Sequence, residues 1–200
     1  MTLKAWEEEY AKSNPVWKGP PLYESPFPPG LDILELGCGN GKNIPALLKT
    51  ASSVTAVDFS RNAVQLCREQ FTDENISVIE ADVCCLPFED EKFDAVCSIH
   101  ILEHLSEKDR TQSRNEICRV LKPGGFLAVR VFSIDDMRFG KGVEVEKNTF
   151  SRGNGINYHY YTNNELESIF DQLKLISMEE LRSEKKYGVR SEISAVFRKY

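Results

Sequence analysis

A glycine-rich turn between an apolar strand and a helix constrains this chain more than any other feature. The strand, residues 31–36, carries Glu35 near its end, and residues 44–48 have apolar side chains at helical spacing. Glycine adopts positive φ without strain and has no Cβ, so a ligand can lie against the backbone of the turn. The helix behind it adds N–H groups and a positive partial charge. This pattern predicts a nucleotide-type site at the carboxyl end of a strand; the glycines are Gly37, Gly39 and Gly41.

The spacing of the glycines excludes two common phosphate sites. A dinucleotide fingerprint would need a third glycine where Lys42 stands, and the turn reads G-x-G-x-G instead. No G-x-x-x-x-G-K-[ST] motif occurs, so the P-loop interpretation fails as well. An NAD-dependent oxidoreductase is therefore disfavoured.

Three further expected strands end in residues that suit a nucleoside ligand. Asp58 ends the strand 53–58, where a carboxylate accepts two hydrogen bonds from a vicinal diol. Asp82 and Val83 follow the strand 76–80, and Ser98 and Ile99 end the strand 93–99. Because the carboxyl ends of parallel strands meet at one edge of a sheet, these residues are expected to converge with the glycine turn.

The order of expected elements predicts an α/β fold, a doubly wound and mostly parallel sheet with helices on both faces. Helices are expected at 3–11, 62–71, 106–120 and 163–173, and later strands at 126–132, 175–181 and 191–197. Ser60 and Ser106 are the expected N-caps. Residues 133–162 have no clear period, and 13–30 are rich in proline. We expect one domain over 1–200: an N-terminal helix and lid (1–29), a cofactor-binding core (31–133) and an acceptor-side insertion with the C-terminal strands (134–200).

The motif Glu35–Gly41, followed by Asp58, Asp82-Val83 and the string RVLKPGG at 119–125, resembles class I S-adenosylmethionine (SAM) dependent methyltransferases. The resemblance covers about half the chain, Leu31 to Ser133. It implies a seven-stranded Rossmann-like sheet in the order 3-2-1-4-5-7-6 with strand 7 antiparallel. It also implies SAM as the cofactor and methyl transfer as the reaction.

Within that resemblance, the glycine backbone meets the methionyl part of SAM, Asp58 holds the ribose, and Asp82 with Val83 holds the adenine. Ser98 and Ile99 lie beside the reacting sulfonium. The full set of implied cofactor residues is Glu35, Gly37, Cys38, Gly39, Asp58, Phe59, Asp82, Val83, Ser98 and Ile99.

The general base, where one is needed, stays open. An anionic acceptor needs no base, whereas a neutral amine or hydroxyl must lose a proton. The side chains able to assist are His100, His104, Tyr158, His159 and Tyr161. A structural role is favoured for His104, because Glu-His after this strand recurs in the family that the chain resembles.

The composition favours a small-molecule acceptor over nucleic acid. The net charge is -6 and the pI about 5.2, and no basic stripe is evident. Trp6, Tyr10 and Trp17 look like the entry segment of thiopurine and tellurite methyltransferases. A competing likeness, in GCGNGK, LCRE and SIHILEHL, is to tRNA wobble-uridine methyltransferases. A protein acceptor and a non-catalytic SAM-binding regulatory subunit stay open as alternatives.

Other features indicate a reduced, metal-free protein. The six cysteines include no C-x-x-C pair, and the three histidines form no zinc motif. No apolar run reaches the length of a membrane span, and the first residues lack a signal-peptide core. We therefore expect a cytoplasmic monomer or homodimer. We also expect 1–29 and 133–162 to close over the site, with Trp6 and Trp17 in the first segment and Tyr158, Tyr160 and Tyr161 in the second.

Overall fold

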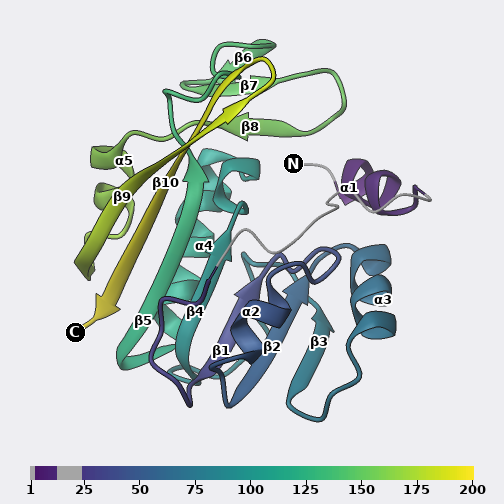
Figure 1. The fold of residues 1–200 in the computed structure, drawn as a ribbon, viewed down its shortest axis with the longest axis vertical. Helices are drawn as coiled ribbons and strands as arrows, with labels where there is room; N and C mark the ends of the chain where they lie inside the picture. The colour runs from purple at the N-terminus through teal and green to yellow at the C-terminus, as the bar shows by residue number, and fades with distance from the viewer. Residues whose placement is uncertain (1–2, 13–23) are drawn as a thin grey trace.

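The computed structural model describes residues 3–12 and 24–200. Its main sheet has seven strands in the order β3-β2-β1-β4-β5-β10-β9 (Figure 1). Since β9 and β10 are the sixth and seventh strands of this sheet in chain order, the predicted order 3-2-1-4-5-7-6 is confirmed. β10 runs antiparallel to both neighbours, as expected. The strands are β1 (Asp32–Leu36), β2 (Ser53–Asp58), β3 (Ile76–Glu80), β4 (Phe93–Ile99), β5 (Leu121–Phe132), β9 (Leu173–Lys185) and β10 (Gly188–Lys199).

Helices cover both faces of the main sheet. Leu34 and Leu36 of β1 belong to one buried cluster with residues of α4 (Glu107–Val120) and α5 (Asn163–Ile169). Ile33, on the opposite face, packs with Leu47 of α2 (Ile44–Leu48). α3 (Arg61–Gln70) covers the same face as α2 through Val64 and Cys67. The period-two alternation along β1 therefore divides the apolar core into two layers.

The predicted helix starts are confirmed by their caps. The Ser60 hydroxyl accepts a hydrogen bond from the backbone of Ala63, and the Ser106 hydroxyl accepts one from Asp109. Ser60 starts α3 directly after β2, whereas the short 3-10 helix η1 (Leu102–His104) separates β4 from the Ser106 cap of α4. The first helix, α1 (Leu3–Tyr10), lies beside the end of α3 at the carboxyl edge of the sheet (Figure 1).

Three strands exceed their expected lengths. β5 begins at Leu121, five residues before the expected start, because Leu121 pairs with Phe93 before the register shifts at the Pro-Gly-Gly segment. β9 and β10 pair from Leu173 to Lys199 through a two-residue turn. The added residues of β9 and β10 are mostly polar, and an edge hairpin that faces solvent along much of its length tolerates such residues.

The segment 133–162 is more regular than its sequence predicts. It holds a three-stranded antiparallel sheet, β6 (Val143–Glu146), β7 (Thr149–Ser151) and β8 (Asn157–His159), beyond the carboxyl edge of the main sheet (Figure 1). These strands are three or four residues long, too short for a period to be read. Within the described ranges, no helix is long and apolar enough to cross a membrane.

Candidate active site

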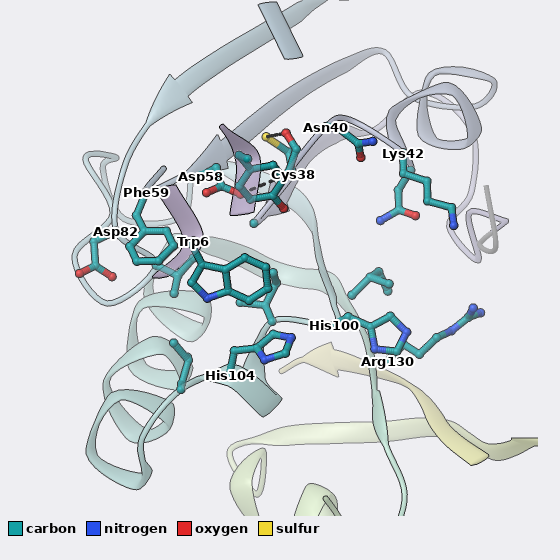
Figure 2. A pocket seen from close by; sticks show the side chains of 18 of the residues that line it. Trp6, Cys38, Asn40, Lys42, Asp58, Phe59, Asp82, His100, His104 and Arg130 are labelled. Carbon is teal, nitrogen blue, oxygen red and sulfur yellow. Dashed lines mark hydrogen bonds between the residues drawn. The ribbon is translucent and has the colours of Figure 1, made fainter. Parts of the chain in front are cut away.

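The carboxyl edge of the main sheet carries a cavity of about 200 Å³ (Figure 2). Its walls come from the ends of β1 to β5, from β10 and from α1. Most residues that the sequence predicts for the site line it: Gly37, Cys38, Gly39, Asp58, Phe59, Asp82, Val83, Ile99, His100 and His104. The expected convergence of strand ends therefore occurs in the fold.

The glycine turn forms one wall of the cavity. Gly37 and Gly39 have φ values of 62° and 54°, in the left-handed region that favours glycine. A Cβ at Gly37 would overlap the side chain of Ile101, and one at Gly39 would press on the Tyr10 hydroxyl. The turn therefore has room for its neighbours only because it has no side chains of its own. Its bare backbone also allows a ligand to lie against it.

Asp58 lies at the centre of the site and braces the turn. One carboxylate oxygen accepts a hydrogen bond from the backbone of Gly39, and the other from the backbone of Ser60, both over 2.9 Å. Burial raises the pKa of Asp58 to about 6, although the backbone donors of Ser60, Gly39 and Phe59 oppose the rise. Each carboxylate oxygen has a second lone pair, so a diol can still be bound by this side chain.

Glu35 lies beneath the turn and does not line the cavity itself. Its Oε1 accepts a hydrogen bond from the side-chain amide of Asn43 over 3.0 Å, and Asn43 does line the cavity. Burial raises the pKa of Glu35 to about 8. Its Oε2 is buried with no hydrogen-bond partner among the described residues. This carboxyl is therefore mostly protonated at neutral pH, and a cation bound close by, such as the ammonium group of the methionyl part of SAM, would favour its ionised form.

The β3 end of the cavity is acidic. Asp82 and Asp109 line it there, and the Oδ1 atom of Asp82 accepts the backbone N–H of Cys84 over 2.8 Å. This contact closes a short turn that leads into Val83, which is buried in the wall. Asp82 and Val83 therefore lie together at one end of the cavity, and the adenine contact that the resemblance implies for them stays a prediction.

The opposite end of the cavity is cationic, which the sequence analysis missed. Lys42, Arg130 and Arg190 line it there, and Figure 2 shows Lys42 and Arg130 on the side away from Asp82. Arg130 stands near the end of an apolar strand, and that position was the only available signal. Arg190 precedes the expected last strand and carries no motif. Net charge averages over the whole surface and therefore concealed this local concentration.

His100 lies between the two ends in a constrained geometry. Its φ of 58° is unusual for a residue with a Cβ. Its Nδ1 lies 2.6 Å from Glu103 and its Nε2 lies 3.5 Å from Glu192. Burial pulls the pKa of His100 down, but the Glu103 and Glu192 carboxylates outweigh it and raise the pKa to about 9. His100 is therefore charged at neutral pH and holds no lone pair for a proton.

His104 is neutral and belongs to an aromatic wall. Burial lowers its pKa, and its Nδ1 donates to the carbonyl of Asn157 over 2.9 Å, which leaves Nε2 as the acceptor nitrogen. The ring packs edge-on against Trp6, at 5.0 Å, and Tyr158, at 5.2 Å. Trp6 and Tyr10 line the cavity from α1, in the region expected to close over it. Trp17, in the same expectation, lies outside the described residues.

The remaining predicted residues lie outside the cavity wall. Ser98 and Tyr161 are fully buried, and Tyr160, expected in the lid, is buried in the insertion. His159 is also buried and bridges the hydroxyl of Thr149 and the carboxylate of Glu165, each over 2.8 Å. Tyr158 does not line the cavity, but its ring contacts His104, which does.

Comparison with known proteins identifies the domain. A family model for a methyltransferase domain matches residues 34–129. The zebrafish (Danio rerio) tRNA N(3)-cytidine methyltransferase METTL2 is 31% identical over 162 residues, which are 74% of this chain and 46% of that protein. An Arabidopsis thaliana tRNA (carboxymethyluridine(34)-5-O)-methyltransferase is 34% identical over 60% of this chain and 28% of its own length. The chain thus spans less than half the length of either relative.

Solved structures share the fold. A SAM-dependent methyltransferase from Methanosarcina mazei has a TM-score of 0.74 at 22% identity, over 86% of this chain and 94% of its own. The N-methyltransferase NodS from Bradyrhizobium japonicum, solved with S-adenosylhomocysteine, has a TM-score of 0.72 at 16% identity, over 98% of this chain and 97% of its own. At these identities the likeness concerns the fold.

The expected small-molecule acceptor is wrong. The relatives named above are tRNA methyltransferases, although the net charge of this chain had favoured an acceptor other than nucleic acid. The proposed likeness of the N-terminal segment to thiopurine and tellurite methyltransferases is not confirmed. Sheet order, strand-end cavity and family model agree, and the chain carries a class I SAM-dependent methyltransferase domain.

Proposed function

We propose that this chain transfers the methyl group of SAM to a nucleoside of tRNA. Residues 31–133 act as the cofactor-binding core, residues 134–200 as the acceptor side, and the N-terminal helix as part of a lid. The observation that carries the proposal is the polarity of the cavity. One end has the carboxylates and bare glycine backbone that suit a nucleoside cofactor, and the other has the cations that suit a polyanionic acceptor.

Each cofactor residue has a role that its surroundings support. Asp58, with lone pairs left on both oxygens, would hold the ribose hydroxyls. Asp82 and the backbone of Val83 would bind the adenine at the β3 end. Glu35, beneath the glycine turn, would attract the ammonium group of the methionyl part through its charge once ionised. When bound, SAM supplies the methyl group as an electrophile on a sulfonium. The chain contributes alignment and exclusion of water, the latter through Trp6 and Tyr10.

The acceptor is a nucleoside atom that already has an available lone pair. N3 of cytidine has one, and the carboxylate of carboxymethyluridine is an anion; these are the positions named for the two relatives. Neither atom has to lose a proton. This agrees with a site in which His100 is already charged and Tyr161 is buried with a pKa raised well above its usual value. His104, with its Nε2 acceptor, orients the base through a hydrogen bond.

Product analysis tests this proposal. The protein is incubated with methyl-labelled SAM and with two tRNA samples, one unmodified and one that carries carboxymethyluridine at position 34. Each tRNA is then digested to nucleosides, which are separated and identified by mass spectrometry. Label is expected in a single modified pyrimidine. Mild alkali releases an ester-bound methyl group but leaves a ring N-methyl group in place, so the treatment identifies the atom. Label absent from every nucleoside, with cofactor binding intact, would refute a tRNA acceptor.

A further inference from the structure

Three arginines from separate segments lie around two aromatic rings beyond the cationic end of the cavity. Arg138 follows β5, Arg152 follows β7 and Arg190 lies on β10; we call them the arginine cluster. The guanidinium groups of Arg138 and Arg190 lie 4.9 Å and 4.7 Å from the centre of the Phe132 ring. That of Arg152 lies 4.3 Å from the centre of the Tyr158 ring. Stacking of this kind fixes the planes of the guanidinium groups.

The two rings connect the arginine cluster to the cavity. The Phe132 ring lies 4.8 Å from the ring of His100, and the Tyr158 ring lies 5.2 Å from that of His104. Both histidines line the cavity, and so does Arg190. An acceptor whose reactive atom enters beside these histidines would therefore have its adjoining groups next to the arginine cluster.

Carboxylates compensate the arginine cluster only in part. Asp136 lies 3.2 Å from Arg138 and 3.8 Å from Arg190, and Arg190 also lies 3.4 Å from Glu192. Glu192 is shared with the charged His100.

Arg152 differs from the other two because its hydrogen bonds go to neutral groups, the hydroxyl of Tyr160 and the carbonyl of Arg138. Buried nitrogens of Arg138 and Arg152 have no hydrogen-bond acceptor within the part of the chain that the structure describes. The arginine cluster thus carries more cationic donors than its own carboxylates satisfy.

We propose that the arginine cluster binds a backbone phosphate of the RNA acceptor, next to the nucleotide that enters the cavity. This inference rests on the proposed function, since it names the group by which a tRNA acceptor is held. Guanidinium groups with fixed planes match the paired oxygens of a phosphodiester. Such contacts set the register of a nucleic acid without reading its sequence. The carboxylate of SAM is the other anion that could reach this end of the cavity, and the experiment separates the two.

The test uses Arg138→Gln and Arg152→Gln in the full chain. Affinity for unmodified tRNA is measured by filter binding at several KCl concentrations, and affinity for S-adenosylhomocysteine by calorimetry. Each variant should bind tRNA about tenfold more weakly, the range for one charge-assisted hydrogen bond. The slope of log affinity against log salt should fall by roughly 0.7 to 0.9 for one lost phosphate contact. The affinity of each variant for S-adenosylhomocysteine should stay within about twofold of the affinity of the wild-type protein.

Arg198→Gln is the matched control. Arg198 lies on β10 at the opposite edge of the sheet and also stacks on a phenylalanine, Phe126, at 5.4 Å. The Arg198→Gln variant loses the same charge, and its affinity for tRNA should equal that of the wild-type protein. Arg152→Lys keeps the charge without the planar fork and should recover part of the affinity while retaining the melting temperature.

The outcomes separate the two proposals. If the unmodified protein methylates tRNA and all glutamine variants bind it equally well, the phosphate site is refuted while the proposed function stands. A loss of S-adenosylhomocysteine affinity at unchanged tRNA affinity would assign the arginine cluster to the cofactor carboxylate and refute the inference. An unmodified protein that neither binds nor methylates tRNA would overturn both.

Discussion

The carboxylate of Glu7 accepts a hydrogen bond from the backbone nitrogen of Arg61 over 2.6 Å, which joins α1 to the first turn of α3. Its second oxygen lies 3.3 Å from the backbone nitrogen of Asn62, whose side chain donates to the Glu7 carbonyl over 3.1 Å. The first N–H groups of a helix have no partner within the helix, so an external carboxylate satisfies them. This contact holds Trp6 and Tyr10 against the cavity.

Removing that carboxylate should loosen the N-terminal lid. We expect Glu7→Ala to weaken S-adenosylhomocysteine binding about three- to tenfold, because a lost cap costs about 1 kcal/mol. Cleavage within residues 3–12 should become faster in limited proteolysis with ligand present. Glu8→Ala is the control, since Glu8 is exposed and pairs only loosely with Lys4, at 3.8 Å. Equal affinities in the two variants would mean that α1 does not close the site.

The role of Asp58 predicts a combined defect. Asp58→Ala should lower S-adenosylhomocysteine affinity about ten- to a hundredfold, the range for losing charge-assisted hydrogen bonds of roughly 1.5 to 3 kcal/mol. Because Asp58 also braces Gly39 and Ser60, the melting temperature without ligand should fall too. Calorimetry and thermal denaturation measure the two effects. A destabilised variant with unchanged affinity would assign Asp58 to the turn alone.

Glu35 predicts how stability depends on pH. Its pKa is raised from 4.5 to about 8, so between these values the folded protein binds more protons at this site than the unfolded chain does. The free energy of unfolding should therefore decrease as pH rises through this window. Asp58 acts in the same direction, but only up to about pH 6.

Glu35→Gln should remove this decrease between pH 6 and 8. By pH 8 it should be more stable than the unmodified protein by about 3–5 kcal/mol, the order that such a pKa difference allows. Urea denaturation at a series of pH values measures it. Parallel curves for the two proteins would show that Glu35 ionises normally in the fold.

The neutral His104 predicts a split between catalysis and binding. His104→Asn can keep the hydrogen bond to the Asn157 carbonyl but lacks an atom at the Nε2 position. Its kcat on tRNA should fall about tenfold or more, which is the effect of losing one hydrogen bond to the acceptor. Its affinity for S-adenosylhomocysteine should change little. His104→Gln restores a polar group near that position and should recover part of the rate. Full activity in the asparagine variant would assign His104 to packing only.

Strand ends were predictable from the sequence because glycine spacing and acidic residues mark them locally. The turn at 37–41, Asp58 and Asp82 were all placed correctly at one edge of the sheet. The sheet order came from the resemblance to a family, which the alternation of elements supported. The insertion was not predictable, since its strands are short and stabilised by contacts with distant segments, as at Tyr160 beside Phe132 and Phe139.

The arginine cluster beyond the cationic end was not predictable for a related reason. Arg138, Arg152 and Arg190 come from separate segments, and only the fold brings them around Phe132 and Tyr158. Overall net charge therefore pointed to the wrong acceptor class. A charged patch that forms across long sequence separations has no local signature.

Transfer of the methyl label tests the central claim most directly. Two tRNA samples, one unmodified and one that carries carboxymethyluridine at position 34, each compete with a mixture of small thiols and oxyanions for a limiting pool of methyl-labelled SAM. Asp58→Ala is the cofactor-site control. We expect label to enter tRNA in stoichiometric amounts and the small molecules to stay unlabelled. Asp58→Ala should transfer the label at least tenfold more slowly at limiting SAM. Label in the small molecules with none in tRNA would contradict it.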